Sequence, residues 1–237
     1  MLIFHSKKQK TILASYQRLA KRIKFMKKIE VVLADDHAVV RMGFKLLLQG
    51  TEDIDVIGEA ESGEEVIKLL TKLKTHVLVM DLSMPGIGGL ETISRVLSKS
   101  APPKILILSA HEDAIYPKRS LKAGANGYLS KRGAPEELIK AIRQINSGAM
   151  YIEPTIAQKM AIDQIGGNSS PVDVLSEREF DVFMALANGQ SVNRIATVLN
   201  LSPRTVGTHL YNIKQKLKVS NQTELALIAI QNGLINP

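Results

Sequence analysis

Four short apolar runs in the first half of the chain each end in polar or charged residues. The runs are followed by Asp35 and Asp36, by Asp81, by Ser109 and by Lys131. In a parallel sheet the carboxyl ends of the strands lie along one edge, so these residues are expected to meet in one crevice. Three carboxylates, a hydroxyl and an ammonium group suit a divalent cation and a phosphoryl group. The pattern therefore predicts an α/β sheet with a phosphoryl-handling site at its edge.

Residues 29–147 alternate short β-rich runs with amphipathic stretches, as in successive βα units. We predict strands at 29–34, 54–60, 76–80, 104–109 and 127–130. We predict helices near 38–49, 63–73, 89–99, 113–123 and 135–147. Five such units predict a doubly wound, flavodoxin-like fold with a five-stranded parallel sheet.

Composition limits the class of protein. The chain has 237 residues, which is enough for two domains, and no Cys, so disulfides and thiolate metal sites are excluded. It contains no apolar stretch of the length needed to span a bilayer and no recognisable signal peptide. We therefore expect a cytoplasmic protein without membrane insertion.

The net charge of +8 is unevenly distributed. Residues 1–28 carry +9, residues 29–174 carry −3, and residues 175–237 carry +2. Because most of the positive charge lies in the leader, the net charge alone does not identify a DNA-binding domain. We expect residues 1–28 to be a disordered basic tail or sequence upstream of the native start. The alternative is a basic amphipathic helix that binds DNA or an anionic surface.

The second half of the chain is predicted to be helical. Residues 148–174 form a linker, with a short helix at 154–164 and a flexible stretch at 166–171. Ser176 and Glu179 fit a capping box that begins a helix ending at Gly189. Further helices are predicted at 191–199, at 203–217 after the cap residue Ser202, and at 221–232 after the cap residue Ser220. Short helices joined by tight turns predict a small helix-turn-helix domain at 175–237.

The predicted helix 203–217 has two contrasting faces. Its apolar face contains Val206, Leu210, Ile213 and Leu217. The opposite face and its flanks contain the candidate DNA-binding residues Arg204, Gly207, Thr208, Tyr211, Asn212, Gln215 and Lys218. This pattern suits a helix in the major groove of DNA. An ordinary amphipathic surface helix is the alternative, and the pattern by itself does not exclude it.

Several motifs resemble the receiver domain of bacterial two-component response regulators. They are Ala34-Asp35-Asp36-His37, Met80-Asp81-Leu82-Ser83-Met84-Pro85-Gly86, Ser109-Ala110 and Gly127-Tyr128-Leu129-Ser130-Lys131. The resemblance covers residues 29–147. It implies that a histidine kinase phosphorylates Asp81 and that Asp35, Asp36, Asp81 and the backbone carbonyl of Ser83 hold Mg²⁺. It also implies that Ser109 is the switch hydroxyl, Tyr128 the aromatic switch residue and Lys131 the phosphate partner. Receivers often have Pro after this Lys, but Arg132 stands there, so no cis peptide bond is expected.

The C-terminal part resembles the LuxR-type helix-turn-helix. The motifs are Leu175-Ser176-Glu177-Arg178-Glu179, Ala187-Asn188-Gly189-Gln190-Ser191, Leu201-Ser202-Pro203-Arg204-Thr205-Val206 and Lys216-Leu217-Lys218-Val219-Ser220-Asn221. Together with the receiver they are similar to the NarL/FixJ family, and the linker looks most like that of regulators of hexose-phosphate uptake. The resemblance places Gly207, Thr208 and Tyr211 against base edges and Thr205 against phosphates. Because twofold dimers read paired half-sites, we expect a homodimer on double-stranded DNA with an inverted-repeat operator.

We interpret the chain as a transcription factor that phosphorylation of Asp81 activates, and not as an enzyme. In this interpretation, phosphorylation draws Ser109 and Tyr128 inward and changes the contacts of the receiver. One alternative is a phosphatase of the haloacid-dehalogenase type, which also uses an Asp nucleophile with Mg²⁺. Such enzymes favour an Asp-x-Asp motif, whereas Leu82 and Ser83 follow Asp81. A second alternative is a receiver that acts through protein contacts alone.

Overall fold

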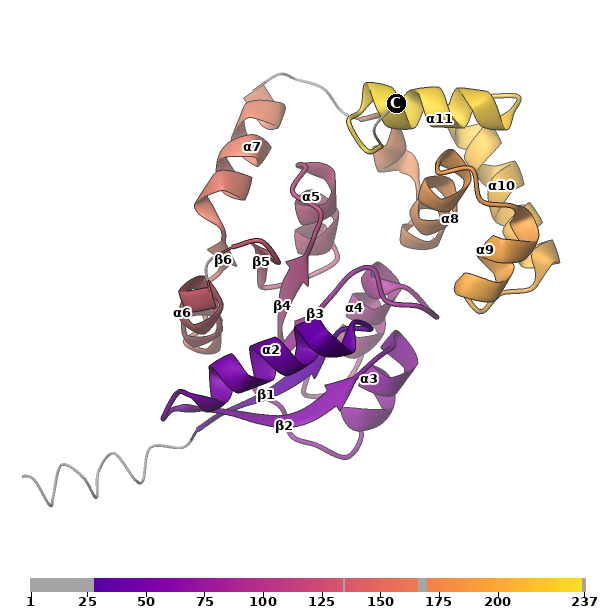
Figure 1. Cartoon of the computed structure of the whole chain (residues 1–237). Helices are drawn as coiled ribbons and strands as arrows, with labels where there is room; N and C mark the ends of the chain where they lie inside the picture. The colour runs from indigo at the N-terminus through magenta and orange to yellow at the C-terminus, as the bar shows by residue number, and fades with distance from the viewer. Residues whose placement is uncertain (1–27, 134, 166–169, 236–237) are drawn as a thin grey trace, which may run out of the picture.

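The computed structural model describes residues 28–133, 135–165 and 170–235 (Figure 1). The predictions for residues 1–27, and most of the predicted flexible stretch at 166–171, lie outside the described residues. None of the described helices combines the length and the apolar character needed to cross a membrane.

The first half of the chain forms a parallel sheet of six strands in the order β2-β1-β3-β4-β5-β6. Its strands are β1 (Ile29–Ala34), β2 (Ile54–Ala60), β3 (Val77–Met80), β4 (Lys104–Ser109), β5 (Gly127–Ser130) and β6 (Tyr151–Ile152). The parallel α/β fold is confirmed, but the prediction of only five strands was wrong. β6 pairs in parallel with β5 through bonds from Tyr151 N to Asn126 O and from Glu153 N to Tyr128 O. With two residues it is too short to give a periodic sequence signal.

Five helices cover the sheet. They are α2 (Ala38–Gln49), α3 (Gly63–Leu69), α4 (Gly89–Leu97), α5 (Ile115–Lys122) and α6 (Pro135–Asn146). α3 ends at Leu69, earlier than predicted, because Thr71 N and Lys72 N donate to Lys68 O and Leu69 O and tighten the chain into turns. Figure 1 shows α2 and α6 on one face of the sheet, with α3, α4 and α5 on the other.

Alternate residues of the central strands fill two hydrophobic cores, as the two-residue period of a strand requires. Val31, Leu33 and Val79 pack with the α2 and α6 side. Val32 and Met80 belong to the other cluster, which continues into the C-terminal domain. The buried face of α3, α4 and α5 is therefore continuous with the domain that follows.

The linker and the C-terminal domain are helical. They comprise α7 (Pro154–Ile165), the 3₁₀-helix η1 (Pro171–Val174), α8 (Glu177–Ala187), α9 (Val192–Val198), α10 (Pro203–Leu217) and α11 (Gln222–Gln231). The Ser176–Glu179 capping box is present. The predicted cap of the last helix was wrong. Asn221 caps α11 by accepting from Glu224 N at 3.0 Å, while the hydroxyl of Ser220 donates to the Glu224 side chain instead.

Candidate functional site

Three carboxylates converge at the carboxyl edge of the sheet. Asp35 and Asp36 follow β1, and Asp81 follows β3, the neighbouring strand. Oxygen atoms of these three side chains and a ring nitrogen of His37 all lie within 4.8 Å of one another. Asp35 and Asp81 are buried, whereas Asp36 is exposed. The structure thus brings together the acidic residues that the sequence singled out.

Lys131 holds the two buried carboxylates together. Its Nζ lies 2.7 Å from Asp35 Oδ2 and 2.8 Å from Asp81 Oδ2. Burial by itself lowers the pKa of Lys131, but the hydrogen bonds to Asp35 and Asp81 outweigh this, so that the pKa is raised. The other oxygen of Asp81, Oδ1, is enclosed and has no hydrogen-bond partner among the described residues. This oxygen is therefore available to a ligand that enters the crevice.

His37 belongs to the same cluster and was not assigned a role from the sequence. Its Nδ1 lies 2.9 Å from Asp36 Oδ1 and 3.2 Å from Asp35 Oδ1, and its backbone N–H donates to Asp35 Oδ1 at 2.9 Å. Its position directly after the acidic pair was the only available signal. The side chain is largely exposed, so it partly shields the two carboxylates on the open side of the crevice.

Ser109 and Tyr128 both contact the backbone of His111. The Ser109 hydroxyl accepts from His111 N at 3.2 Å, and the Tyr128 hydroxyl donates to His111 O at 2.8 Å. Burial raises the pKa of the Tyr128 phenol, so it stays a proton donor at physiological pH. Tyr128 is already fully buried, so the expected inward movement of its ring has no counterpart in this conformation.

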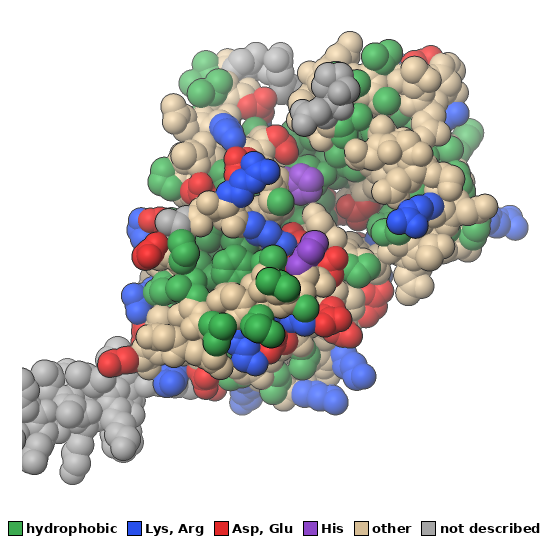
Figure 2. Space-filling view, viewed as in Figure 1, with side chains coloured by type: hydrophobic (Ala, Val, Ile, Leu, Met, Phe, Trp, Pro, Cys, Tyr) green, Lys and Arg blue, Asp and Glu red, His purple; other side chains and the backbone are tan. Residues whose placement is uncertain are grey.

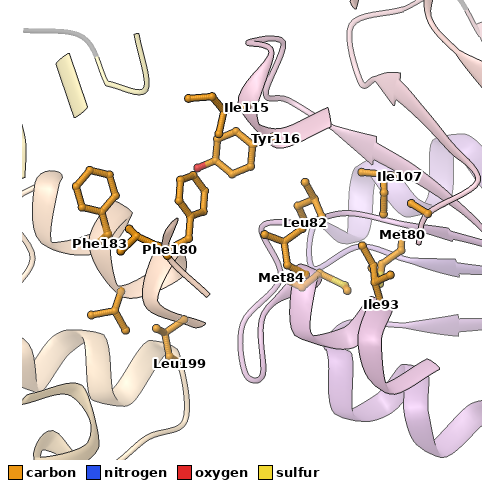
Figure 3. Close-up of a cluster of buried hydrophobic side chains, with 14 of the residues drawn as sticks. Met80, Leu82, Met84, Ile93, Ile107, Ile115, Tyr116, Phe180, Phe183 and Leu199 are labelled. Carbon is orange, nitrogen blue, oxygen red and sulfur yellow. The ribbon is translucent and has the colours of Figure 1, made fainter. Parts of the chain in front are cut away.

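An aromatic contact leads from His111 to the C-terminal domain. The ring of His111 stacks on Tyr116 of α5 with centroids 3.9 Å apart, and Tyr116 meets Phe180 of α8 edge-on at 5.3 Å. Figure 3 shows Tyr116 and Phe180 facing each other between the two domains. The guanidinium of Arg119, also on α5, lies 4.2 Å from the Phe180 ring centroid. No sequence signal pairs these residues, because they lie about sixty positions apart in the sequence.

A second contact joins the C-terminal domain to the loop between Asp81 and α4. Arg178 of α8 donates to Ile87 O at 2.6 Å and to Leu199 O at 2.6 Å. Gly86 N donates to Val198 O at 3.1 Å. Both domains therefore share hydrogen bonds through the loop that begins at the central carboxylate.

The candidate reading face of α10 is open to solvent. Val206 and Ile213 are buried in the C-terminal core, which leaves the opposite side of the helix free. Gly207, Thr208 and Tyr211 are exposed, the last at 64%. The receiver contacts α8 and the end of α9, so it does not cover this face.

The remaining candidate DNA contacts lie around the same helix. Arg204, Gln215 and Lys218 are exposed, while Thr205 and Asn212 are partly buried. Thr205 lies at the amino end, where its backbone N–H and hydroxyl contact the Ser202 hydroxyl at 3.0 and 2.8 Å. Lys218 ends α10 in the left-handed conformation, with φ 56°. These residues border the reading face at both ends.

Two family models match the chain. The response regulator receiver domain matches residues 31–143, and the luxR family of bacterial regulatory proteins matches residues 173–229. The first match contains the acidic crevice, Ser109, Tyr128 and Lys131. The second contains α8, α9 and α10 in full.

Similar proteins and structures span most of the chain. Response regulator UvrY of Escherichia coli K12 is 43% identical over 210 residues, covering 88% of this chain and 96% of that protein. Response regulator GacA of Pseudomonas aeruginosa is 40% identical over 210 residues, covering 88% and 98%. A structure of the RcsB response regulator of Salmonella typhimurium is 28% identical with a TM-score of 0.67, covering 87% and 99%. RcsB bound to the promoter P1flhDC with the phosphomimetic BeF₃⁻ is 29% identical with a TM-score of 0.65, covering 85% and 98%.

Proposed function

This chain belongs to the NarL/FixJ family of two-component response regulators, which bind DNA and regulate transcription, and we propose that phosphoryl transfer to Asp81 controls its dimerisation and promoter binding. The single observation that carries the proposal is the convergence of Asp35, Asp36 and Lys131 on Asp81. The alternative of a phosphatase was wrong, because the family consists of regulators and not enzymes. The alternative of a receiver that acts through protein contacts alone was wrong as well, because the luxR family model matches residues 173–229.

Asp81 has the chemistry of a phosphoryl acceptor. Its carboxylate attacks the phosphorus of a phosphohistidine, the P–N bond breaks, and the donor imidazole leaves with the electron pair, so that an acyl phosphate forms. Asp81 Oδ2 is held by Lys131, while Oδ1 has no partner among the described residues. Lys131 is close enough to contact the added phosphoryl group, whose negative charge needs a cation nearby.

The donor set of the crevice fits Mg²⁺, a hard cation that prefers carboxylate and carbonyl oxygens. We assign Asp36 and Asp81 as ligands, together with the backbone carbonyl of Ser83, and Asp35 as a ligand or as the group that orients a bound water. When bound, Mg²⁺ neutralises the carboxylates and the charge that develops on the phosphoryl group. The unpartnered Oδ1 of Asp81 supports this assignment.

A phosphohistidine must approach across the surface that surrounds Asp81. α2 begins at Ala38, two residues after Asp36, and exposes Val39 at 85%, Met42 at 63% and Leu46 at 63%. Their spacing of three and four residues puts them on one face of the helix. Figure 2 shows hydrophobic side chains gathered over α2. We assign this stripe as the docking surface for the histidine kinase, because an apolar patch beside the crevice suits a partner helix.

We propose that Ser109 and Tyr128 couple the crevice to the C-terminal domain. A phosphoryl group on Asp81 attracts the Ser109 hydroxyl, and both switch residues contact the backbone of His111. A shift of His111 changes its stack on Tyr116 and hence the edge contact with Phe180. Phosphorylation thereby biases the equilibrium between docked and separated domains.

The candidate reading face is open to solvent while the two domains are in contact. Contact between the domains therefore cannot control DNA binding by covering this face. We propose that separation of the domains lets two C-terminal domains pair on DNA. Gly207, Thr208 and Tyr211 would then face base edges, with Arg204, Thr205 and Lys218 near phosphates and Asn212 and Gln215 beside them. RcsB is described as bound to DNA as dimers, which supports a homodimer on an inverted repeat for this chain. Binding to DNA also favours a cytoplasmic location.

The proposal is tested by labelling, sedimentation and DNA binding on the same preparations. A small-molecule phosphodonor with Mg²⁺ should add one phosphoryl group to the wild type, increase its dimer fraction and tighten promoter binding. Asp81→Asn should abolish all three responses. Asp55→Asn is the matched control, because Asp55 is an exposed acid on the edge strand β2. Equal labelling of Asp81→Asn would exclude Asp81 as the acceptor.

A second experiment, with a histidine kinase as the phosphodonor, distinguishes the role of the docking surface from that of the acceptor Asp81. Met42→Ser on α2 should slow transfer from the histidine kinase encoded beside this gene, if there is one, or otherwise from a panel of kinases. It should leave labelling by the small-molecule donor unchanged, because the crevice is intact. If both donors were affected equally, Met42 would act on the fold or the crevice and not on docking.

A further inference from the structure

A pocket of about 920 Å³ lies at the opposite edge of the receiver from Asp81. It is formed by the segment 70–76 before β3, the segment 99–103 before β4 with Lys104 at the start of that strand, and Asn146 at the end of α6. β3 and β4 both start here, so the pocket belongs to the amino edge of the sheet. It takes no part in the phosphoryl chemistry, and its volume lies in the range of small-molecule sites, about 300–1,000 Å³.

The lining of the pocket is strongly basic. It contains Lys72, Lys74, Lys99 and Lys104, together with His76, and no carboxylate lines it. The Glu30 carboxylate lies behind the lining, 3.4 Å from His76 Nδ1. None of these lysines forms an ion pair with a residue that the structure describes. Lys45 and Lys216, elsewhere in the molecule, do pair with carboxylates. The four lysines are therefore without a carboxylate partner among the described residues, and an anion in the pocket would supply the missing negative charge.

Positive side chains at this edge have a simpler explanation that accounts for only part of the cluster. Helices of a doubly wound fold end at the amino edge of the sheet, and their last carbonyls carry partial negative charge. Lys99 compensates this charge at the end of α3, because its Nζ donates to Ile67 O at 3.3 Å. Lys72, Lys74 and Lys104 make no side-chain hydrogen bond within the described residues. At least three cations are thus left for another partner.

The walls of the pocket offer more than charge. Leu70, Leu73, Pro102 and Pro103 supply apolar surface, and Thr75 supplies a hydroxyl that is enclosed and has no partner among the described residues. His76 Nδ1 accepts from Glu30 N at 2.9 Å, so its proton lies on Nε2. Apolar walls beside several hydrogen-bond donors and cations suit a ligand with a flat apolar part and a phosphate chain.

We propose that this pocket is a binding site for a small phosphorylated anion of the nucleoside polyphosphate class. The phosphates contact Lys72, Lys74 and Lys104, and the base lies against the prolines and leucines. A concave site built from two short loops favours a small ligand over a nucleic acid, which needs an extended basic track. The site lies outside the phosphorylation and DNA-reading surfaces and is occupied independently of them.

The test is calorimetric titration of the full chain in EDTA, which keeps metal-bound phosphate out of the acidic crevice. ATP is the probe, and AMP, inorganic triphosphate and a random DNA duplex are the comparisons. ATP should bind with a stoichiometry of one, more tightly than AMP and than inorganic triphosphate. Lys72→Gln combined with Lys104→Gln should weaken ATP binding at least about tenfold, which corresponds to about 1.4 kcal/mol.

Lys140→Gln is the matched control, because Lys140 is an exposed lysine of α6 outside the pocket. It should leave ATP binding unchanged, and since the basic leader is present in every variant, its contribution cancels. Thermal unfolding checks that the double variant is folded. Equal binding by the double variant and the wild type would overturn the proposal, as would AMP binding as tightly as ATP. If the duplex alone bound through Lys72 and Lys104, the site would belong to nucleic acid and the proposal would fail.

Discussion

The acidic crevice collects its residues from three separate loops of the receiver, whereas the candidate reading face comes from the single helix α10. In the crevice, Asp35 and Asp81 are buried and share Lys131. On the candidate reading face, Thr208 and Tyr211 are exposed, and the Thr208 hydroxyl donates to Arg204 O within α10 itself. Charges in the crevice are therefore strongly coupled to one another and to the fold, while side chains on the reading face act almost independently.

The largest expected effect tests the coupling in the crevice. Lys131→Met removes the cation and leaves two buried carboxylates facing each other, so it should lower the free energy of unfolding without metal by about 3 kcal/mol. Mg²⁺ should restore most of this loss, because it replaces the missing charge. Denaturant unfolding with and without Mg²⁺ measures both effects.

Lys45→Met provides the comparison on the surface. Lys45 contacts Glu59 at 2.5 Å, but both side chains are about one third exposed, so the loss should stay below about 1 kcal/mol. If Lys131→Met lowered the free energy of unfolding as little as Lys45→Met does, the two buried carboxylates would not depend on Lys131. The crevice would then be no more strongly coupled to the fold than the surface is.

Substitutions on the candidate reading face should change DNA binding and leave stability almost unchanged. Thr208→Ala and Tyr211→Ala should each weaken specific DNA sites by about 1–3 kcal/mol, because a base contact is lost. Binding to random DNA and the free energy of unfolding should change little. Competition binding with specific and scrambled duplexes measures the ratio.

Thr223→Ala on α11 is a control at an exposed threonine outside α10. An unchanged ratio of specific to random binding in both α10 variants would mean that another surface reads the bases. A large loss of stability would mean that the face is coupled to the fold after all.

Stability should depend on pH through Asp181 of α8, which lies at the contact between the receiver and the C-terminal domain. Burial is the main cause that raises the pKa of Asp181 from 3.8 to about 7; Arg178 opposes the shift and the charge of Glu177 contributes to it. Arg119 also lowers this pKa and Glu91 raises it. Gly88 of the receiver lies against this carboxyl, since a Cβ on Gly88 would fall 2.5 Å from Asp181 Oδ2.

Because the pKa is higher in the folded protein than its ordinary value, folding takes up a proton. The stability that Asp181 contributes is fully present below pH 3.8 and is lost as the pH rises through about 7. Asp181→Asn should flatten this dependence by about 1–2 kcal/mol across the window. Thermal unfolding between pH 5 and 8 measures it. Asp55→Asn should leave the slope as in the wild type, and an equal slope in Asp181→Asn would assign the proton to another group.

The smallest effect concerns the border of the reading face. Lys218→Asn removes a charge while keeping a residue that tolerates the left-handed conformation. It should weaken specific and random DNA by similar factors and reduce the slope of log K against log salt by about 0.9 for one phosphate contact. A change in the ratio of the affinities for specific and random DNA would instead mean that Lys218 contacts bases.

Much of this molecule follows from local sequence patterns. The alternation of apolar runs predicts β1 to β5 and their helices, because period and turn residues are local properties. The order of polar residues after the strands predicts the crevice, since parallel strands end at one edge. The two faces of α10 follow from helical periodicity in the same way. The domain boundaries and the roles of individual site residues stay predictions.

Only the tertiary structure decided which side chains face one another across long separations in the chain. The bridge from Lys131 to Asp35 and Asp81, the contact of Tyr116 with Phe180, and the burial of Asp181 against Gly88 have no local signature. The strand β6 depends likewise on the edge that β5 offers. Packing sets these contacts, because burial and charge compensation depend on the neighbours that the fold brings together and not on adjacent residues.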